Sequence, residues 1–241
     1  MKNIAVLLVV FSVFTTTSCR YVFSKRVSGD GNVITQDRSV GQFKNVDVRG
    51  SIDVIVKQDS VSSVKIKADQ NLMEYIEVID DGIVLIVRER PGFRLRPTQD
   101  IKVYVTAPLF KEIRVSGAGD ITSDGKINSQ EGLSMSVSGA GDVTMDVNAP
   151  TVHASLSGSG TINLKGQSKD FEADISGAGD ANCFEMLAEN TSIEISGAGS
   201  ADVYASVKLD VRVSGAGSVS YKGSPAVSQR ISGAGSVNKA E

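Results

Sequence analysis

Apolar and polar residues alternate one by one through most of the second half of the chain. Leu133, Met135 and Val137 form one such run of inward-facing positions, and polar residues separate them. Alternation over four to eight residues is typical of a β-strand with one buried face and one hydrated face. Similar strand-like runs occur earlier in the chain, at residues 46–56, 64–67, 76–79, 83–87 and 101–105. No segment of the second half has the period of a long helix, so the pattern predicts an all-β protein.

A short motif recurs between the strand-like runs. Ser-Gly-Ala-Gly, or a variant that differs at one residue, starts at Ser116, Ser138, Ser157, Ser176, Ser196, Ser214 and Ser232. The spacing of about 20 residues indicates one structural unit that buries its apolar face by stacking on its neighbours. Both glycines of each motif fall at inward positions, where the absence of a Cβ permits a sharp corner. The sequence therefore predicts a parallel β-helix with coils of about 20 residues.

Residues 41–106 follow the same pattern less regularly. The segment 43–54 is similar to the segment that begins at Phe110, and it places Gly50 where the later segment has Gly117. These two glycines are 67 residues apart, a distance that corresponds to about three coils. We therefore expect one solenoid over residues 41–237, with irregular coils at 41–106 and regular repeats at 107–237, in preference to two separate domains.

The first 18 residues have the features of a secretory signal. Lys2 is their one charged residue, an apolar run covers residues 4–14, and small hydroxylated residues precede Cys19. The run is too short to span a bilayer as a helix, but it fits the central part of a signal peptide. Cleavage before Cys19 would expose the thiol and the amine that bacterial lipoprotein processing acylates. We expect a lipid at Cys19 and a polar tether over residues 19–40, with plain secretion as the alternative.

Composition narrows the chemistry that the chain can perform. A formal net charge of −3 lacks the broad positive field of a nucleic-acid-binding protein, so no nucleic-acid partner is expected. Cys183 is the one other cysteine, which excludes an internal disulfide once Cys19 is acylated, and its inward position predicts a small core residue. The single histidine, His153, is expected to face solvent alone. Neither a metal site, a cofactor nor a nucleophilic triad is therefore predicted.

The residues that follow the corners are candidates for ligand binding. They are Asp120, Asp142, Thr161, Asp180, Ser200, Ser218 and Ser236. Stacked coils would align them in one ladder, in which Asp120, Asp142 and Asp180 could bind a hard cation or sugar hydroxyls. The structural alternative is that such residues bond to the backbone at the corners. The outward serines of the motif would form a second polar column that either binds a glycan or stabilises stacking.

A cluster of arginines is the most distinctive feature outside the repeats. Arg88, Arg90, Arg94 and Arg96 lie close together in the sequence, with Phe93 among them. Guanidinium groups bind carboxylates and phosphates with two hydrogen bonds, so an acidic polysaccharide, a lipid A phosphate or a protein partner are candidate ligands. A solvated charged loop is the alternative.

Several of these features together resemble a known family. The signal, the segment 43–54, the stretch 68–72 and the repeated Ser-Gly-Ala-Gly-Asp are similar to the family called putative auto-transporter adhesin, head GIN domain. The resemblance implies a right-handed β-helix of short coils in an exported protein of Bacteroidetes or related bacteria. Residues 20–22 lack the acidic run that resembles a surface-export signal in these bacteria. This favours outer-membrane attachment that faces the periplasm over attachment that faces the cell surface.

The sequence thus predicts a lipid-anchored, non-catalytic binding or adhesin-like module of the cell envelope, with a glycan or an envelope protein as partner. The alternatives are a carbohydrate-active β-helix enzyme, either a lyase or a hydrolase, and a purely structural envelope protein. Short coils and the absence of tryptophan for sugar stacking argue against an enzyme. Two carboxylates, or an arginine and a carboxylate, that converge in a groove would favour one.

Overall fold

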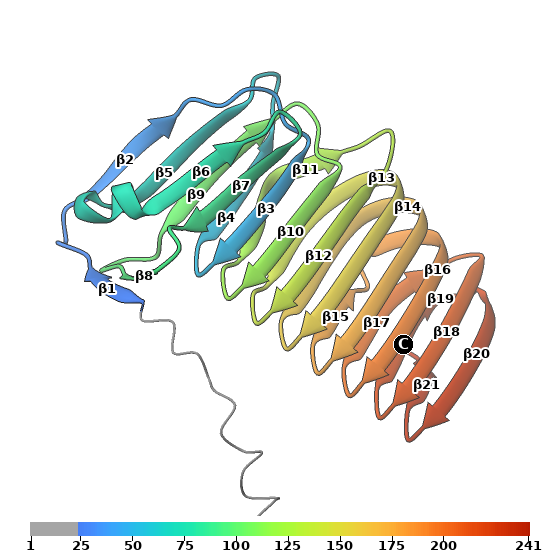
Figure 1. Ribbon diagram of the computed structural model, residues 1–241. Coiled ribbons are helices and arrows are strands. Elements are labelled where there is room, and N and C mark those ends of the chain that lie inside the picture. The colour runs from blue at the N-terminus through green and yellow to red at the C-terminus, as the bar shows by residue number, and fades with distance from the viewer. Residues whose placement is uncertain (1–23) are drawn as a thin grey trace, which may run out of the picture.

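A computed structural model describes residues 24–241 of the chain, so the predicted signal at 1–18 and the predicted lipid at Cys19 lie outside the described residues. The described residues are mostly strand and wind into one elongated β-solenoid of about seven turns (Figure 1). This confirms the all-β solenoid expected from the repeated motif. No helix among residues 24–241 is long and apolar enough to cross a membrane.

Each regular coil has a strand before its Ser-Gly-Ala-Gly corner and a strand after it. The strands before the corners form the pre-corner face, which consists of β10 (Glu112–Gly117), β12 (Leu133–Gly139), the second halves of β13 (Val143–Gly158) and β14 (Thr161–Gly177), β16 (Met186–Gly197), β18 (Lys208–Gly215) and β20 (Ala226–Gly233). The strands after the corners form the post-corner face, which consists of β11 (Ile121–Asn128), the first halves of β13 and β14, β15 (Asp180–Cys183), β17 (Ser200–Ala205), β19 (Ser218–Gly223) and β21 (Ser236–Lys239).

Neighbouring coils pair in parallel and in register. Ser157 of one motif lies beside Ser138 of the previous motif and beside Ser176 of the next. Inward side chains of these strands up to β19 join one continuous apolar core that runs from Phe43 to Val219. Val237 of β21 packs against the end of this core, whereas β20 is exposed along its whole length. Each outward position therefore becomes part of a column of side chains that runs along the solenoid, with one residue for each coil.

The irregular first part of the solenoid has a chain order that the sequence did not indicate. β3 (Asn45–Gly50) pairs in parallel with β10 on one side and with β7 (Val84–Glu89) on the other. In the same way β4 (Asp53–Gln58) lies between β11 and β9 (Lys102–Ala107). Gly50 and Gly117 are therefore direct neighbours, and the expectation of about three coils between them is wrong. After β4 the chain moves to one side of β3 and β4, where β7 and β9 form a further coil. It then crosses to the opposite side of β3, where β10 begins the regular coils.

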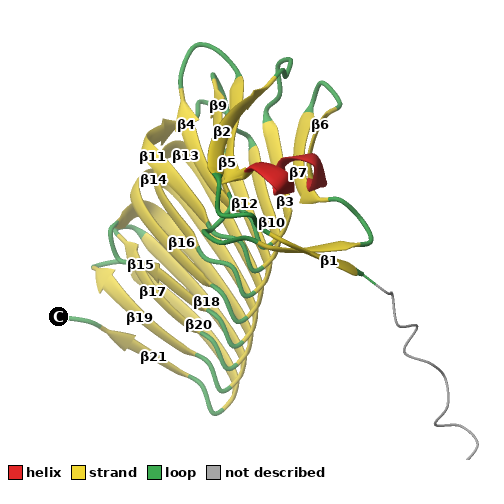
Figure 2. Ribbon diagram, turned by 90° about the vertical axis from the view of Figure 1, so that its left-hand side faces the viewer, coloured by secondary structure: helices red, strands yellow, loops and turns green. Residues whose placement is uncertain are grey.

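Antiparallel strands close this end of the solenoid (Figure 2). β2 (Val33–Arg38) pairs with β5 (Ser63–Asp69), β5 also pairs with β9, and β6 (Ile76–Asp80) pairs with β7. The short 3-10 helix η2 (Gln70–Tyr75) joins β5 to β6. These additions cover the first coil, whose edge would otherwise present unpaired backbone groups.

The tether expected over residues 19–40 differs from the structure after residue 24. β1 (Lys25–Ser28) forms a parallel two-stranded ribbon with β8 (Phe93–Arg96), and β2 belongs to the antiparallel cover. Val27, Ile34 and Val40 also pack against the core. The polar composition of this segment had indicated a linker. Its few apolar residues nevertheless pack against the core and make the segment part of the folded body.

Candidate functional site

The predicted ladder of carboxylates exists, and its members bond to the backbone of the next coil. Asp120 Oδ1 accepts a hydrogen bond from the Asp142 N–H at 2.9 Å, and Asp142 Oδ1 accepts one from the Thr161 N–H at 2.7 Å. The Ser200 N–H donates to Asp180 Oδ1 at 3.1 Å in the same manner. These bonds connect successive coils at the corners, which is a structural use of the carboxylates.

The four arginines of the cluster do not converge on one site. Arg88 and Arg90 both pair with Glu77, at 2.9 Å and 3.4 Å between nitrogen and oxygen, and Arg90 also lies over the ring of Tyr75 at 5.6 Å. Arg94 and Arg96 are exposed on β8 and form no ion pair with another described residue. Arg88 and Arg90 are therefore paired with Glu77, whereas Arg94 and Arg96 lie on the separate two-stranded ribbon of β1 and β8.

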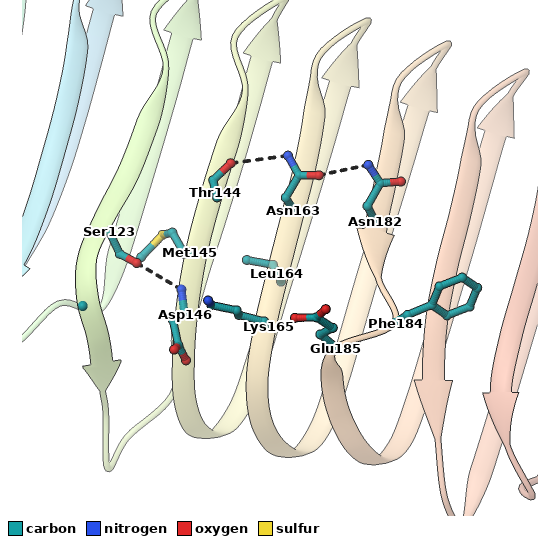
Figure 3. A pocket seen from close by; sticks show the side chains of 11 residues that line it. Ser123, Thr144, Met145, Asp146, Asn163, Leu164, Lys165, Asn182, Phe184 and Glu185 are labelled. Atoms are coloured by element: carbon teal, nitrogen blue, oxygen red, sulfur yellow. Dashed lines mark hydrogen bonds between the residues drawn. The ribbon is translucent and has the colours of Figure 1, made fainter.

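A groove on the post-corner face is a concave site that several stacked coils form together. Its volume is about 440 Å³, and it crosses β11, β13, β14 and the end of β15 (Figure 3). It is lined by Ser123, Gly125, Thr144, Met145, Asp146, Asn163, Leu164, Lys165, Asn182, Phe184 and Glu185. None of these residues is among the candidates predicted from the sequence.

A column of hydrogen-bonding side chains runs along the groove from coil to coil. Asn163 Nδ2 donates to Thr144 Oγ1 at 3.4 Å, and Asn182 Nδ2 donates to Asn163 Oδ1 at 2.9 Å. Each amide nitrogen carries a second hydrogen, and an amide oxygen can accept two hydrogen bonds. The column is therefore held in place internally and still has donors and acceptors to offer to a ligand.

Charged groups of alternating sign form the neighbouring column. Lys165 lies in register with Asp146, and Glu185 follows on the next coil, so that Figure 3 shows the lysine between the two carboxylates. Asp146 is also 3.7 Å from the Lys126 ammonium, and its backbone N–H donates to Ser123 Oγ at 3.0 Å. The lining of the groove therefore carries two carboxylates and one ammonium group.

Two interruptions of the regular coil create the groove. The pairing of β11 with β13 shifts register between Thr122 and Lys126, which makes room at one end. At the other end the chain turns at Phe184 and Glu185 after β15, and the half-buried ring of Phe184 lies 5.0 Å from the Lys222 ammonium. The 19-residue spacing of Thr144, Asn163 and Asn182 was visible in the sequence, but the turn that makes their column concave was not.

His153 is not alone on the surface, and that expectation is wrong. The pairing of β13 with β14 places it beside Glu172, with 3.4 Å between Nδ1 and Oε2. Its other nitrogen, Nε2, is 3.9 Å from Asp174 Oδ2. This cluster lies on the pre-corner face, whereas the groove lies on the post-corner face.

Cys183 is buried in the core, as expected from its inward position. Burial raises the pKa of its thiol to about 12, so the group stays protonated near neutral pH. The cysteine is a packing residue and not a nucleophile.

The described chain is thus a parallel β-solenoid with a polar groove across several coils. The family model of the putative auto-transporter adhesin, head GIN domain, matches residues 42–225. The chain belongs to this family. No protein with a curated description matches it.

Several solved structures have the same fold. A putative adhesin from Bacteroides fragilis is 21% identical with a TM-score of 0.83, and the match covers 89% of this chain and 100% of that one. A putative lipid binding protein from Parabacteroides distasonis is 24% identical with a TM-score of 0.76, over 90% and 100% of the two chains. A putative adhesin from the same species is 27% identical with a TM-score of 0.69, again over 90% and 100%.

Proposed function

We propose that this protein is a non-catalytic binding module of the bacterial cell envelope, and that the groove on its post-corner face binds a glycan chain. The column of Thr144, Asn163 and Asn182 is the observation that carries this proposal. Membership of an adhesin family and the names of the similar structures support a binding role and an exported location.

The chemistry of the groove suits sugars. Amide and hydroxyl side chains both donate and accept hydrogen bonds, as sugar hydroxyls do. Phe184 offers an apolar ring at the end of the groove, against which the C–H face of a sugar can pack. Parallel strands lie about 4.8 Å apart, so the column presents one hydrogen-bonding side chain at each such interval. A regular repeat of this kind suits an extended polymer better than a single small molecule.

The charges of the groove restrict the kind of glycan. Asp146 and Glu185 flank Lys165, so a strongly anionic chain would meet two carboxylates for one ammonium. A largely neutral glycan can donate hydroxyl hydrogen bonds to both carboxylates and accept one from the lysine. We therefore expect a neutral glycan in preference to a polyanion.

The same two carboxylates favour a second candidate function, which is hydrolysis of the bound glycan. Asp146 and Glu185 belong to coils two steps apart, which is about 10 Å at the usual strand spacing. Inverting glycosidases hold their two carboxyl groups at about 6.5–9.5 Å, so the two side chains would have to lean toward each other from this backbone spacing. Two carboxylates in one groove are the arrangement expected of a carbohydrate-active enzyme.

A glycan array tests the proposal with the purified protein. We expect binding to a neutral glycan, and we expect the double substitution Asn163→Ala and Asn182→Ala to weaken it about tenfold or more through loss of hydrogen bonds. Asn148→Ala is the matched control, because Asn148 is an exposed amide in a neighbouring column outside the groove. A blank array, or binding that the double variant leaves unchanged, would contradict the proposal.

Product analysis on the bound glycan separates the two candidate functions. A binding module leaves the chain length of the glycan unchanged. New reducing ends that disappear in both the Asp146→Asn and the Glu185→Gln variants would identify a hydrolase instead.

Attachment to the membrane is the other part of the proposal. Acylation of Cys19 would place the β1 end of the solenoid near the outer membrane, with the protein on its periplasmic side. The support is the order of signal features before Cys19 and the short distance in sequence from Cys19 to β1 at Lys25.

A further inference from the structure

We propose that His153, Glu172 and Asp174 form a binding site for a zinc-like divalent cation on the pre-corner face. One possible ligand atom from each of the three residues lies within 4.8 Å of the other two. The groups belong to two adjacent coils, since His153 is on β13 and both carboxylates are on β14. The site is separate from the glycan groove, and the proposal does not depend on glycan binding.

The pairing of β13 with β14 sets the backbone positions of the three ligand residues relative to one another. In-register pairing sets His153 directly beside Glu172, and it sets Asp174 beside Ser155, two positions further along the same strands. Residues two apart on a strand point to the same face, so both carboxylates project on the side of the imidazole. Zinc binds its ligands tetrahedrally at about 2.0–2.2 Å, which places two ligand atoms about 3.3–3.6 Å apart. The ligand atoms, now within 4.8 Å of one another, must therefore move closer together, and the three side chains are 36–56% exposed, so they have room to rotate.

The kinds of donor atoms indicate the class of cation. An imidazole nitrogen suits zinc, copper and nickel, whereas calcium and magnesium prefer sites made of oxygen alone. One nitrogen and two carboxylate oxygens supply three protein ligands, which leaves a coordination position for water or for a group of a partner. Among the metals that accept this donor set, zinc is the redox-inert choice for an exported protein.

The electrostatic surroundings favour a cation. Among the described residues, neither Glu172 nor Asp174 forms an ion pair with a lysine or an arginine. Glu194 lies beside Asp174 on the next coil and adds a third carboxylate, 4.0 Å from Arg212. The negative charges of Glu172 and Glu194 repel the carboxylate of Asp174. A bound divalent ion would relieve this repulsion.

The single histidine of the chain makes the test direct, because its ring gives the one imidazole signal of the NMR spectrum. Zinc chloride is titrated into the untagged full-length protein at neutral pH. We expect the imidazole resonances to shift or broaden in a saturable way, and we expect calcium chloride to leave them unchanged. An unchanged imidazole signal at millimolar zinc would overturn the proposal.

Variants decide whether the carboxylates are ligands. By calorimetric titration, Glu172→Gln and Asp174→Asn should each weaken zinc binding at least about tenfold, and His153→Ala should abolish it. Glu189→Gln is the control, because Glu189 is an exposed carboxylate of β16 outside the cluster. Equal affinity in the wild type and in the double carboxylate variant would mean that an isolated histidine binds the ion, and the proposed site would be rejected.

Discussion

Gly177 is an example of how single residues set the shape of a coil. It adopts φ +123°, a conformation that residues with a side chain rarely adopt. A Cβ at this position would lie 2.5 Å from the carbonyl oxygen of Gly158 in the previous corner. Both the backbone conformation and the approach of the neighbouring coil therefore require glycine here.

Replacement of Gly177 by valine tests this interpretation. The change adds backbone strain and overlap with a main-chain atom that cannot move aside, so we expect unfolding to become easier by about 3 kcal/mol or more. Ala178→Val is the control, because Ala178 is exposed in the same corner. Thermal melting measures both. Equal melting temperatures for the two variants would contradict the stacked-corner explanation.

Asp69 acts at the scale of whole elements, because its carboxylate joins three segments of the closed end. It lies at the end of β5 and accepts hydrogen bonds from the Gly31 N–H at 2.8 Å, the Thr98 N–H at 2.9 Å and the Thr98 hydroxyl at 2.6 Å. Gly31 precedes β2, and Thr98 follows β8. The antiparallel cover therefore depends on one buried carboxylate to hold its loops in place.

This carboxylate makes the stability of the closed end depend on pH. Burial raises the pKa of Asp69, but the hydrogen bonds from Thr98 and Gly31 together lower it by more, so it lies below the ordinary value of 3.8. A carboxyl group whose pKa is lower in the folded state stabilises that state above its ordinary pKa. The stabilisation is lost as the pH falls through the lower folded value.

We expect Asp69→Asn to lower the free energy of unfolding by about 1–3 kcal/mol, since the amide replaces one acceptor by a donor that faces the Thr98 N–H. The difference from wild type should stay constant above about pH 5 and shrink below about pH 4. Asp37→Asn on β2 is the control, because the Asp37 side chain is 80% exposed. Thermal melts over this pH range measure the effect. A difference that is independent of pH would refute the role of the ionised carboxylate.

The whole molecule has two different ends. Antiparallel strands and the β1–β8 ribbon close the end nearest to residue 24, and the regular coils extend away from it (Figure 1). With a lipid at Cys19, the closed end would face the membrane and the groove would stand away from it. This arrangement is suited to presenting a binding face to material in the envelope.

Cys19→Ser tests the anchor in cells that express the protein. The hydroxyl cannot take the thioether-linked lipid, so we expect the protein to move from the membrane fraction to the soluble fraction. Cys183→Ala is the control, since Cys183 is buried and should not affect attachment. Immunoblots of the two fractions measure the distribution. Retention of the Cys19→Ser protein in the membrane fraction would point to another means of attachment.

The solenoid could be predicted from the amino-acid sequence, because alternation and period are properties of each strand and each coil. The alternate positions of Leu133, Met135 and Val137 indicate which side chains of the strand are buried. The spacing of the corner glycines indicates the length of a coil. The same regularity made the carboxylate ladder and the burial of Cys183 predictable.

Which segments lie side by side could be seen only in the three-dimensional fold. The order β7, β3, β10 depends on pairing between strands far apart in the chain, which local pattern does not encode. The groove depends on a turn at Phe184, and the cluster of His153 with Glu172 and Asp174 depends on the register between β13 and β14. A column of side chains takes one residue from each coil, so its chemistry exists only when the coils are stacked.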